Sequence, residues 1–237
     1  NIIPLYPALV PFEVDDEHIK ELNGLSLKNI RVSLYSRYKE GDWQLEFSGI
    51  GQMHFTQFGI SGPMVIGASR GMAKLLDRGR KLMVSVNLKP TMEHKKLEKR
   101  IQQFADDKPA KSIKTVLYDL LPERLVPVIL SRANINPCHK AGEITRNQRK
   151  ILANTMMDLQ ISISGVRPMS EALVTGGGVD LKEVNPKTLE SYLVPGLFFC
   201  GEILDIDGPT GGYNLTVAFS TGYVAGISAA DKILEER

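Results

Sequence analysis

The stretch GLFFCGEILDIDGPTGGYNLTVAFSTGYVAG, residues 196–226, limits the possible folds of this chain more than any other. It joins a short apolar run, a turn rich in aspartate and glycine, and a segment of helical composition. A strand that passes through a glycine-rich turn into a helix can hold an anionic ligand, because the first N–H groups of the helix have no partner within it. The usual phosphate-binding motifs, G-x-G-x-x-G and G-x-x-x-x-G-K-S/T, are absent from the stretch. The pattern therefore predicts a ligand that is not held by either of these phosphate-binding motifs.

The acidic residues of this stretch favour a ligand with hydroxyl groups. The run LFFC, residues 197–200, is interpreted as a short strand buried on both faces. Gly201 follows it and permits close approach to the backbone, and Glu202, Asp205 and Asp207 come next. Ionised carboxylates suit sugar-type hydroxyls because each accepts two or more O–H bonds. A ligand with hydroxyls at one end and an electron-rich group at the other fits, such as a flavin with its ribityl chain.

The second half of the stretch predicts a helix over residues 215–230, with free N–H groups near residues 212–214. Several small residues lie on adjoining faces of this helix: Ala218, Gly222, Ala225, Gly226 and Ala229. Glycine inside a helix costs up to about 1 kcal/mol relative to alanine. The helix is therefore expected to pack very close to a sheet or to a second helix.

Composition places the chain among ordinary globular proteins with two or three lobes. It has 237 residues, of which 43% are hydrophobic and 24% charged, with a formal net charge of +2. Cys138 and Cys200 form no C-x-x-C motif, so neither a disulfide scaffold nor a metal site is expected. No apolar run is long enough for a membrane span, and prolines interrupt the apolar start NIIPLYPALVPF. A cytoplasmic location is expected.

Alternating apolar residues predict a β-rich lobe. Residues 30–49 are expected to form a hairpin with a turn at residues 39–42. Residues 81–88 and 158–164 show the same alternation and add further strands. One buried face over four or more strands indicates a small antiparallel or mixed sheet.

Residues 91–157 have helical periodicity instead, and Pro122 suits a helix start. Residues 91–150 carry 13 Lys or Arg against 7 Asp or Glu, whereas residues 166–237 carry 5 against 10. Two interpretations of the basic segment stay open. It is a solvated helix face, or it is a binding module that contacts nucleic acid or an acidic protein.

The C-terminal stretch resembles the FAD-binding motif of the HI0933-like (YhiN/BaiN-type) flavoproteins. Other stretches that carry the resemblance are PALVPF at 7–12, FTQFGISGP at 55–63 and GVRPMSEALVTGGGVDLKEVNPKTLESYLVPGLFF at 165–199. The resemblance implies an FAD-dependent oxidoreductase, with NAD(P)H as reductant and a small organic molecule as acceptor. It also implies a Rossmann-type FAD-binding domain interrupted by a β-rich and a helical insert. The family's N-terminal strand, G-x-G-x-x-G turn and helix have no counterpart in this sequence, which is similar to the later part of such a protein.

The overall expectation is therefore an α/β chain with α+β inserts, in four segments. These are a β-rich insert lobe at 1–90, a helical insert lobe at 91–157, a returning strand of the β lobe at 158–170, and the C-terminal strand–helix part of the FAD-binding domain at 171–237. Neither a membrane nor a nucleic acid is expected as a partner.

The cofactor-binding residues that the resemblance implies lie in three groups: Thr175, Gly176 and Gly177; Gly201 and Glu202; and Asp207, Gly208, Gly211, Gly212, Tyr213, Asn214 and Leu215. Glu202 is the candidate partner for ribityl hydroxyls, and the last group would offer N–H donors to the pyrimidine edge of the flavin. A plain β-turn at residues 175–178 remains an equal alternative for the first group.

No catalytic acid or base is identified. In FTQFGISGP, Ser61 is a possible N-cap and Pro63 a good first helical residue. The family pattern has histidine where Gln57 stands, and an amide cannot exchange a proton near neutral pH. The pair Cys138-His139 is expected to be a surface feature without a metal.

Overall fold

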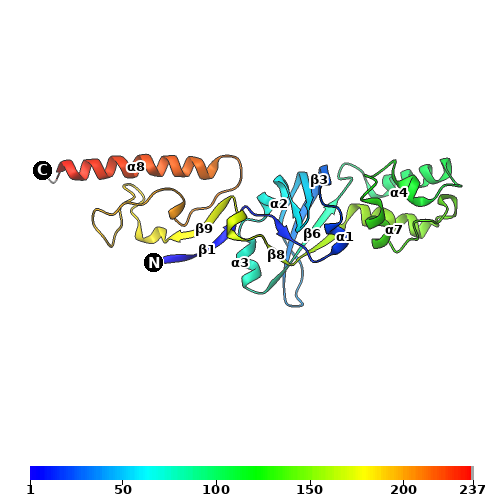
Figure 1. Ribbon diagram of the computed structural model, residues 1–237, viewed down its shortest axis with the longest axis horizontal. Helices are drawn as coiled ribbons and strands as arrows, with labels where there is room; N and C mark the ends of the chain where they lie inside the picture. Colours follow the sequence, from blue (N-terminus) through cyan, green and yellow to red (C-terminus); the bar gives the residue numbers. More distant parts are fainter. Residues whose placement is uncertain (236–237) are drawn as a thin grey trace. The chain divides into compact units, whose positions relative to one another are not determined.

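The computed structural model describes residues 1–235, which combine strands and helices as expected of a mixed α/β chain (Figure 1). Internal contacts group them into two compact units. Unit 1 comprises residues 1–11, 69–78 and 166–235, and unit 2 comprises residues 12–68 and 79–165. The domain limits expected at residues 90, 157 and 170 stay a prediction.

Unit 2 is built on a seven-stranded sheet in the order β7-β6-β3-β4-β5-β2-β8, whose last strand ends one residue beyond the unit. The strands are β2 (Phe12–Glu13), β3 (Ser26–Tyr38), β4 (Gln44–Thr56), β5 (Gly59–Ser61), β6 (Arg80–Asn87), β7 (Leu159–Ile163) and β8 (Gly165–Val166). The pairs β3–β4, β3–β6 and β6–β7 are antiparallel. The hairpin and the two further strands predicted from alternation are confirmed.

Alternation along the strands buries one face of this sheet. In β3, Ile30, Val32 and Leu34 are at most 2% exposed, and Val32 pairs with Val86 of β6. A turn that contains Lys39 and Gly41 joins β3 to β4, and the Gly41 N–H donates to the Tyr38 carbonyl at 3.0 Å. Because side chains alternate between the two faces of a strand, this register fixes which residues reach the core.

Four α-helices form the expected helical segment of unit 2: α4 (His94–Asp107), α5 (Ile113–Leu117), α6 (Val126–Arg132) and α7 (Arg146–Met157). Leu97 and Ile101 are fully buried, which confirms the helical periodicity. The helix start predicted at Pro122 is wrong. The Leu125 N–H donates to the Pro122 carbonyl at 2.9 Å in a turn, and α6 begins only at Val126.

Unit 2 also contains two short α-helices, α1 (Glu17–Lys20) and α2 (Pro63–Ala68), and the 3-10 helix η1 (Ala141–Glu143). The helix start predicted at Pro63 is confirmed, but Ser61 is not its cap. Ser61 ends β5, and Gly62, with φ of 96°, is the residue before the helix. The Ile66 N–H donates to the Gly62 carbonyl at 2.9 Å.

Unit 1 contains a two-stranded antiparallel sheet of β1 (Ile2–Ala8) and β9 (Val174–Val179), which lie side by side in Figure 1. Helix α3 (Met72–Asp77) contacts β1. The chain then forms the 3-10 helices η2 (Met169–Glu171), η3 (Leu181–Glu183) and η4 (Gly201–Ile203), and ends in α8 (Tyr213–Glu235). Strand β9 continues through its three glycines, so a plain β-turn at residues 175–178 is wrong.

The strand predicted at residues 197–200 is also wrong. Only an isolated bridge between Phe198 and Glu190 occurs there, and Leu197 is 42% exposed. A strand buried on both faces needs neighbouring strands and layers on both sides. Within the described residues, the nearest parallel pairing is a single bridge between Val179 and Leu204. An apolar run without such neighbours has no ladder to join.

Helix α8 begins at Tyr213, two residues before the predicted start at Leu215, and its two glycines do not mark close packing. A Cβ added at Gly222 or at Gly226 would meet no atom within 4 Å among the described residues. Ala225 is its buried residue and joins a core with Val179, Val184, Leu189 and Leu204. Across residues 1–235, no helix combines the length and the apolar character that a membrane span requires.

Candidate functional site

All twelve residues predicted to bind the cofactor lie in unit 1. Thr175, Gly176 and Gly177 belong to β9, whereas Gly201 and Glu202 begin η4. Residues 207–212 form the loop before α8, and residues 213–215 are its first turn. The site is therefore built from one strand, one short helix and one helix start.

The glycines of β9 serve the packing of the chain itself. A Cβ on Gly176 would lie 2.1 Å from Cζ of Tyr6, so the Tyr6 ring fills the space of a side chain. At Gly177 a Cβ would lie 2.3 Å from the Pro4 carbonyl oxygen, and at Gly178 it would lie 2.4 Å from that of Ile203. These approaches explain the GGG sequence without a ligand.

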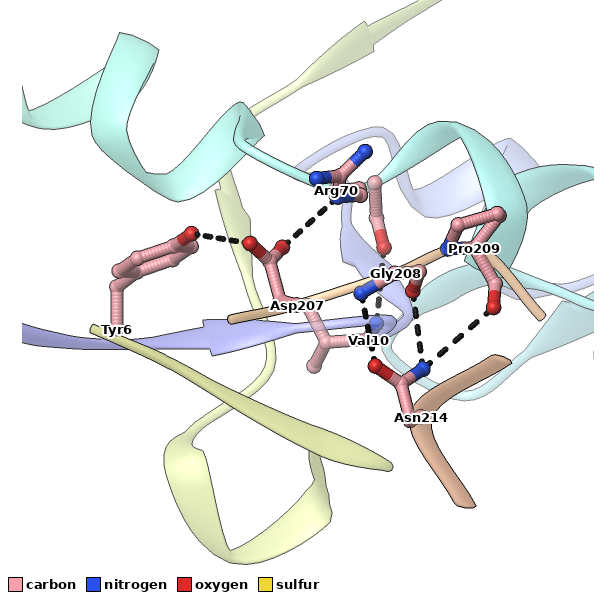
Figure 2. A network of polar contacts seen from close by, with 8 residues as sticks. Tyr6, Val10, Arg70, Asp207, Gly208, Pro209 and Asn214 are labelled. Atoms are coloured by element: carbon pink, nitrogen blue, oxygen red, sulfur yellow. Dashed lines mark hydrogen bonds and ion pairs between the residues drawn. The ribbon is translucent and has the colours of Figure 1, made fainter. Parts of the chain in front are cut away.

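The Asp207 carboxylate binds two side chains from distant segments (Figure 2). The Tyr6 hydroxyl donates to Oδ1 at 3.2 Å, and Arg70 Nε donates to Oδ2 at 3.0 Å. Tyr6 comes from β1, and Arg70 lies between α2 and α3. The side chain of Asp207 is 12% exposed and that of Arg70 is 48% exposed, so the ion pair lies at the edge of unit 1.

The environment of Tyr6 keeps its hydroxyl protonated. Burial, the charge of Asp207 and the hydrogen bond to Asp207 together raise the pKa of Tyr6 to about 12. The Lys74 ammonium lies 3.9 Å from the centroid of the Tyr6 ring. At neutral pH Tyr6 is therefore a neutral hydrogen-bond donor, and it is not a base.

The loop after Asp207 is closed by Asn214. The Gly208 N–H donates to Asn214 Oδ1 at 2.7 Å, and Asn214 Nδ2 donates to the Gly208 carbonyl at 3.0 Å (Figure 2). Gly211 and Gly212 have φ of 112° and 91°, which L side chains rarely adopt. The sequence of small residues here is thus required by the turn itself.

The start of α8 is open. Its first N–H groups have no partner within the helix, whereas the Thr216 N–H already donates to the Gly212 carbonyl at 2.9 Å. Tyr213 is 60% exposed and Leu215 is 64% exposed. Donors at a helix start favour an anion or an electron-rich ring edge.

A cavity of about 520 Å³ lies in unit 1 next to two of the predicted residues, Thr175 and Glu202. Most of its wall is apolar and comes from Ile2, Leu5, Val179, Leu193, Val194, Leu197, Phe199 and Ile203. Glu202 is exposed and no partner for its carboxylate is present among the described residues. An apolar wall with one free carboxylate suits a ligand that has both a ring system and hydroxyl groups.

The sequence analysis missed Tyr6 and Arg70. Arg70 follows the quoted FTQFGISGP motif by seven residues, and Tyr6 stands immediately before the quoted PALVPF. No spacing in the sequence joins either to Asp207, since the pairs are separated by 137 and 201 residues. The immediate neighbours gave no signal, because Tyr6 stands between Leu5 and Pro7 and Arg70 between Ser69 and Gly71.

The remaining candidates are not among the twelve predicted cofactor-binding residues. Gln57 and Pro63 belong to unit 2. Cys138 is exposed, and its N–H donates to Asn136 Oδ1 at 2.9 Å in a loop. Cys200 is exposed as well, and both cysteines are free thiols.

Comparison with known proteins defines the class. A family model described as the HI0933-like protein barrel and H2TH domain matches residues 6–174. The chain belongs to this HI0933-like family, which confirms the resemblance found in the sequence. The residues of η4 and α8 lie beyond the matched region, but they lie within the alignments to whole relatives.

Two kinds of relative are found. The chain is 33% identical over 232 residues to the 3-dehydro-bile acid delta(4,6)-reductase of Clostridium scindens, with 98% of this chain and 55% of that protein covered. It is 31% identical over 233 residues to the ribosomal RNA dihydrouridine synthase of Haemophilus influenzae (96% and 52% covered). The Escherichia coli synthase of the same name is 30% identical over 223 residues (94% and 52% covered). The chain thus spans about half the length of these relatives, whose names describe oxidoreductases.

Alanine at Gly176 and at Gly222 should have opposite effects on the free energy of unfolding. Gly176→Ala should destabilise unit 1 by about 1–3 kcal/mol, because its Cβ would overlap the Tyr6 ring. Gly222→Ala adds a methyl group in open space on α8, so it should stabilise by up to about 1 kcal/mol. Urea unfolding followed by circular dichroism measures both, and effects of the same sign would contradict this packing.

Proposed function

We propose that this chain is the flavin-contacting part of an FAD-dependent oxidoreductase that uses NAD(P)H. Family membership carries the proposal, together with relatives named as a reductase and as a dihydrouridine synthase. The C-terminal stretch would then be the returning part of a Rossmann-type FAD-binding domain. A cytoplasmic location belongs to the same proposal.

The acceptor that we propose is a carbon–carbon double bond. The term delta(4,6) in one relative's name denotes double bonds, and dihydrouridine differs from uridine by two hydrogens across one such bond. The balanced reaction converts NAD(P)H, a proton and the unsaturated acceptor into NAD(P)⁺ and the saturated product. Bound FAD would supply hydride transfer between these two substrates.

The donor set of unit 1 supports this cofactor. The first N–H groups of α8 would bind the pyrimidine edge of the flavin, where charge accumulates on reduction. Glu202 would accept hydrogen bonds from ribityl hydroxyls, and Thr175 lines the same cavity. The apolar wall beside Thr175 and Glu202 offers a surface for a ring system, but it includes no residue of the α8 start.

The chain's own side chains do not supply an evident acid or base for this reaction. Tyr6 keeps its proton because its pKa is raised to about 12. Gln57 stands where the family pattern has histidine, and its amide holds its protons at neutral pH. The roles that we assign to residues of unit 1 are therefore binding and orientation of the cofactor.

The affinity for FAD should be higher in the protein as its gene encodes it than in this 237-residue chain. The protein as its gene encodes it should be yellow, with a flavin absorption spectrum. The isolated chain should bind FAD weakly, because it contains no G-x-G-x-x-G turn for the pyrophosphate. Loss of several kcal/mol of contacts weakens affinity by a factor of about a thousand or more.

Titration of both proteins with FAD, followed by flavin fluorescence, measures this difference. A gene product that remains colourless after incubation with FAD would contradict the proposed function. Submicromolar, stoichiometric binding by the isolated chain would show instead that the α8 region suffices.

A second candidate function is contact between the helical segment of unit 2 and nucleic acid. Helices α4, α5 and α7 have no acidic residue in their first turn. In α4 this turn carries Lys95 and Lys96, of which Lys96 pairs with the N-cap residue Glu93 at 3.5 Å. Cations at a helix N-terminus oppose the helix dipole, so an anionic partner would relieve this cost. Burial and the positive charge of Arg100 on α4 lower the pKa of Lys89, so an anionic partner would also be favourable at this lysine. Two of the relatives are named for ribosomal RNA.

RNA affinity should depend steeply on salt if this second candidate is correct. Lys95 and Lys99 are both exposed on α4 and lie one turn apart. The double variant Lys95→Glu/Lys99→Glu should weaken binding and reduce the log–log salt slope by about one per lost phosphate contact. The control Lys182→Glu/Lys187→Glu makes the same charge change in unit 1 and should leave the slope unchanged. Absence of RNA binding at low ionic strength would eliminate this candidate.

A further inference from the structure

We infer that Tyr6, Arg70 and Asp207 are positioning residues for the flavin: together they fix the loop that presents the start of α8. This inference rests on the proposed function and assigns Asp207 a supporting role in place of direct contact with the cofactor. It joins three segments of unit 1, namely β1, the chain before α3 and the loop before α8.

The orientation of Asp207 carries the first step. Each of its carboxylate oxygens accepts one side-chain hydrogen bond, at 3.2 Å from the Tyr6 hydroxyl and at 3.0 Å from Arg70 Nε (Figure 2). The side chain is 12% exposed. A carboxylate engaged in this way on both oxygens points into unit 1, and its strongest bonds are made to the chain itself.

Tyr6 is itself held in one place. Its side chain is buried, its ring occupies the space above Gly176, and the Lys74 ammonium lies 3.9 Å from the ring centroid. A buried hydroxyl that loses its acceptor pays its full desolvation cost. Asp207 therefore has one low-energy position relative to β1 and β9.

The position of Asp207 determines where the loop enters the start of α8. Gly208 follows Asp207, and its N–H and carbonyl both bind the Asn214 side chain, at 2.7 and 3.0 Å. The loop is thus fixed at Asp207 by β1 and Arg70, and at Asn214 by the helix. Arg70 is anchored in turn, because the neighbouring Ser69 hydroxyl accepts the Val10 N–H at 2.8 Å.

The charges of Arg70 and Asp207 should change the flavin midpoint potential in opposite directions when each is removed, which a loss of packing alone would not do. Arg70 and Asp207 form an ion pair at 3.0 Å, so together they add no net charge beside the loop. Removal of the carboxylate leaves a cation, which favours the anionic reduced flavin. Removal of the guanidinium leaves an anion, which disfavours it.

The experiment compares FAD affinity and flavin midpoint potential in the protein as its gene encodes it. Asp207→Asn should raise the Kd about tenfold, and Tyr6→Phe should raise it less. The double variant should resemble Asp207→Asn alone, because the two residues act through one bond. Asp207→Asn should raise the midpoint potential, whereas Arg70→Gln should lower it.

Two further variants serve as controls. Arg78→Gln removes the same charge from an exposed site at the end of residues 69–78. It should change neither the Kd for FAD nor the flavin midpoint potential. Arg70→Lys keeps the charge but loses the planar guanidinium, so it should preserve the potential and still weaken binding. Thermal melting followed by circular dichroism shows that each variant is folded.

A measurement without flavin tests the network on the 237-residue chain. The chain has seven tyrosines, so the absorbance titration of Tyr6→Phe is subtracted from that of the unmodified chain to isolate Tyr6. The pKa of Tyr6 should be about 12 and should fall in Asp207→Asn, since a negative neighbour and a hydrogen-bond acceptor are lost.

The outcomes are distinct. Unchanged affinity and potential in Asp207→Asn and Arg70→Gln, in a protein that binds FAD, would overturn the positioning role and leave the proposed function in place. An unmodified gene product that binds no FAD would overturn both. Shifts of the potential in the same direction in both variants would assign the effect to loss of packing and would also overturn the inference.

Discussion

The arrangement of the candidate site depends on one carboxylate. Asp207 receives hydrogen bonds from Tyr6 and Arg70, which lie 201 and 137 residues away in the sequence. These bonds hold three segments in fixed positions relative to one another: the edge of the β1–β9 sheet, the chain before α3 and the loop before α8. Gly176 belongs to the same arrangement, because only a residue without Cβ leaves room for the Tyr6 ring. Several residues that a motif would assign to the cofactor therefore first satisfy the packing and hydrogen bonding of unit 1.

Strands, helices and helix starts could be predicted from the sequence where neighbouring residues alone determine them. The alternation of Ile30, Val32 and Leu34 predicted β3, and the helical spacing of Leu97 and Ile101 predicted α4, because burial of one face imposes these periods. The start of α2 at Pro63 also followed from the chemistry of helix ends, whereas α8 begins at Tyr213, two residues before its predicted start. The family could be recognised from motifs alone, and the match over residues 6–174 confirms it.

Features that depend on distant partners could not be predicted. The run at residues 197–200 has the composition of a buried strand, but a strand forms only where neighbouring strands offer a ladder, and the described residues provide isolated bridges there. Gly222 and Gly226 suggested close helix packing, yet within residues 1–235 no atom lies within 4 Å of a Cβ built at either position. Tyr6 and Arg70 belong to no motif, and only the fold brings them to Asp207. The assignment of Thr175, Glu202 and the first residues of α8 to a flavin remains a proposal.

A crystal structure of the gene product with FAD bound tests the central claim most directly. We expect the flavin to contact backbone N–H groups within residues 211–215, while Asp207 keeps its hydrogen bonds to Tyr6 and Arg70. Flavin bound at this loop with the Asp207 carboxylate turned toward the cofactor, and with Tyr6 and Arg70 released from it, would contradict the account.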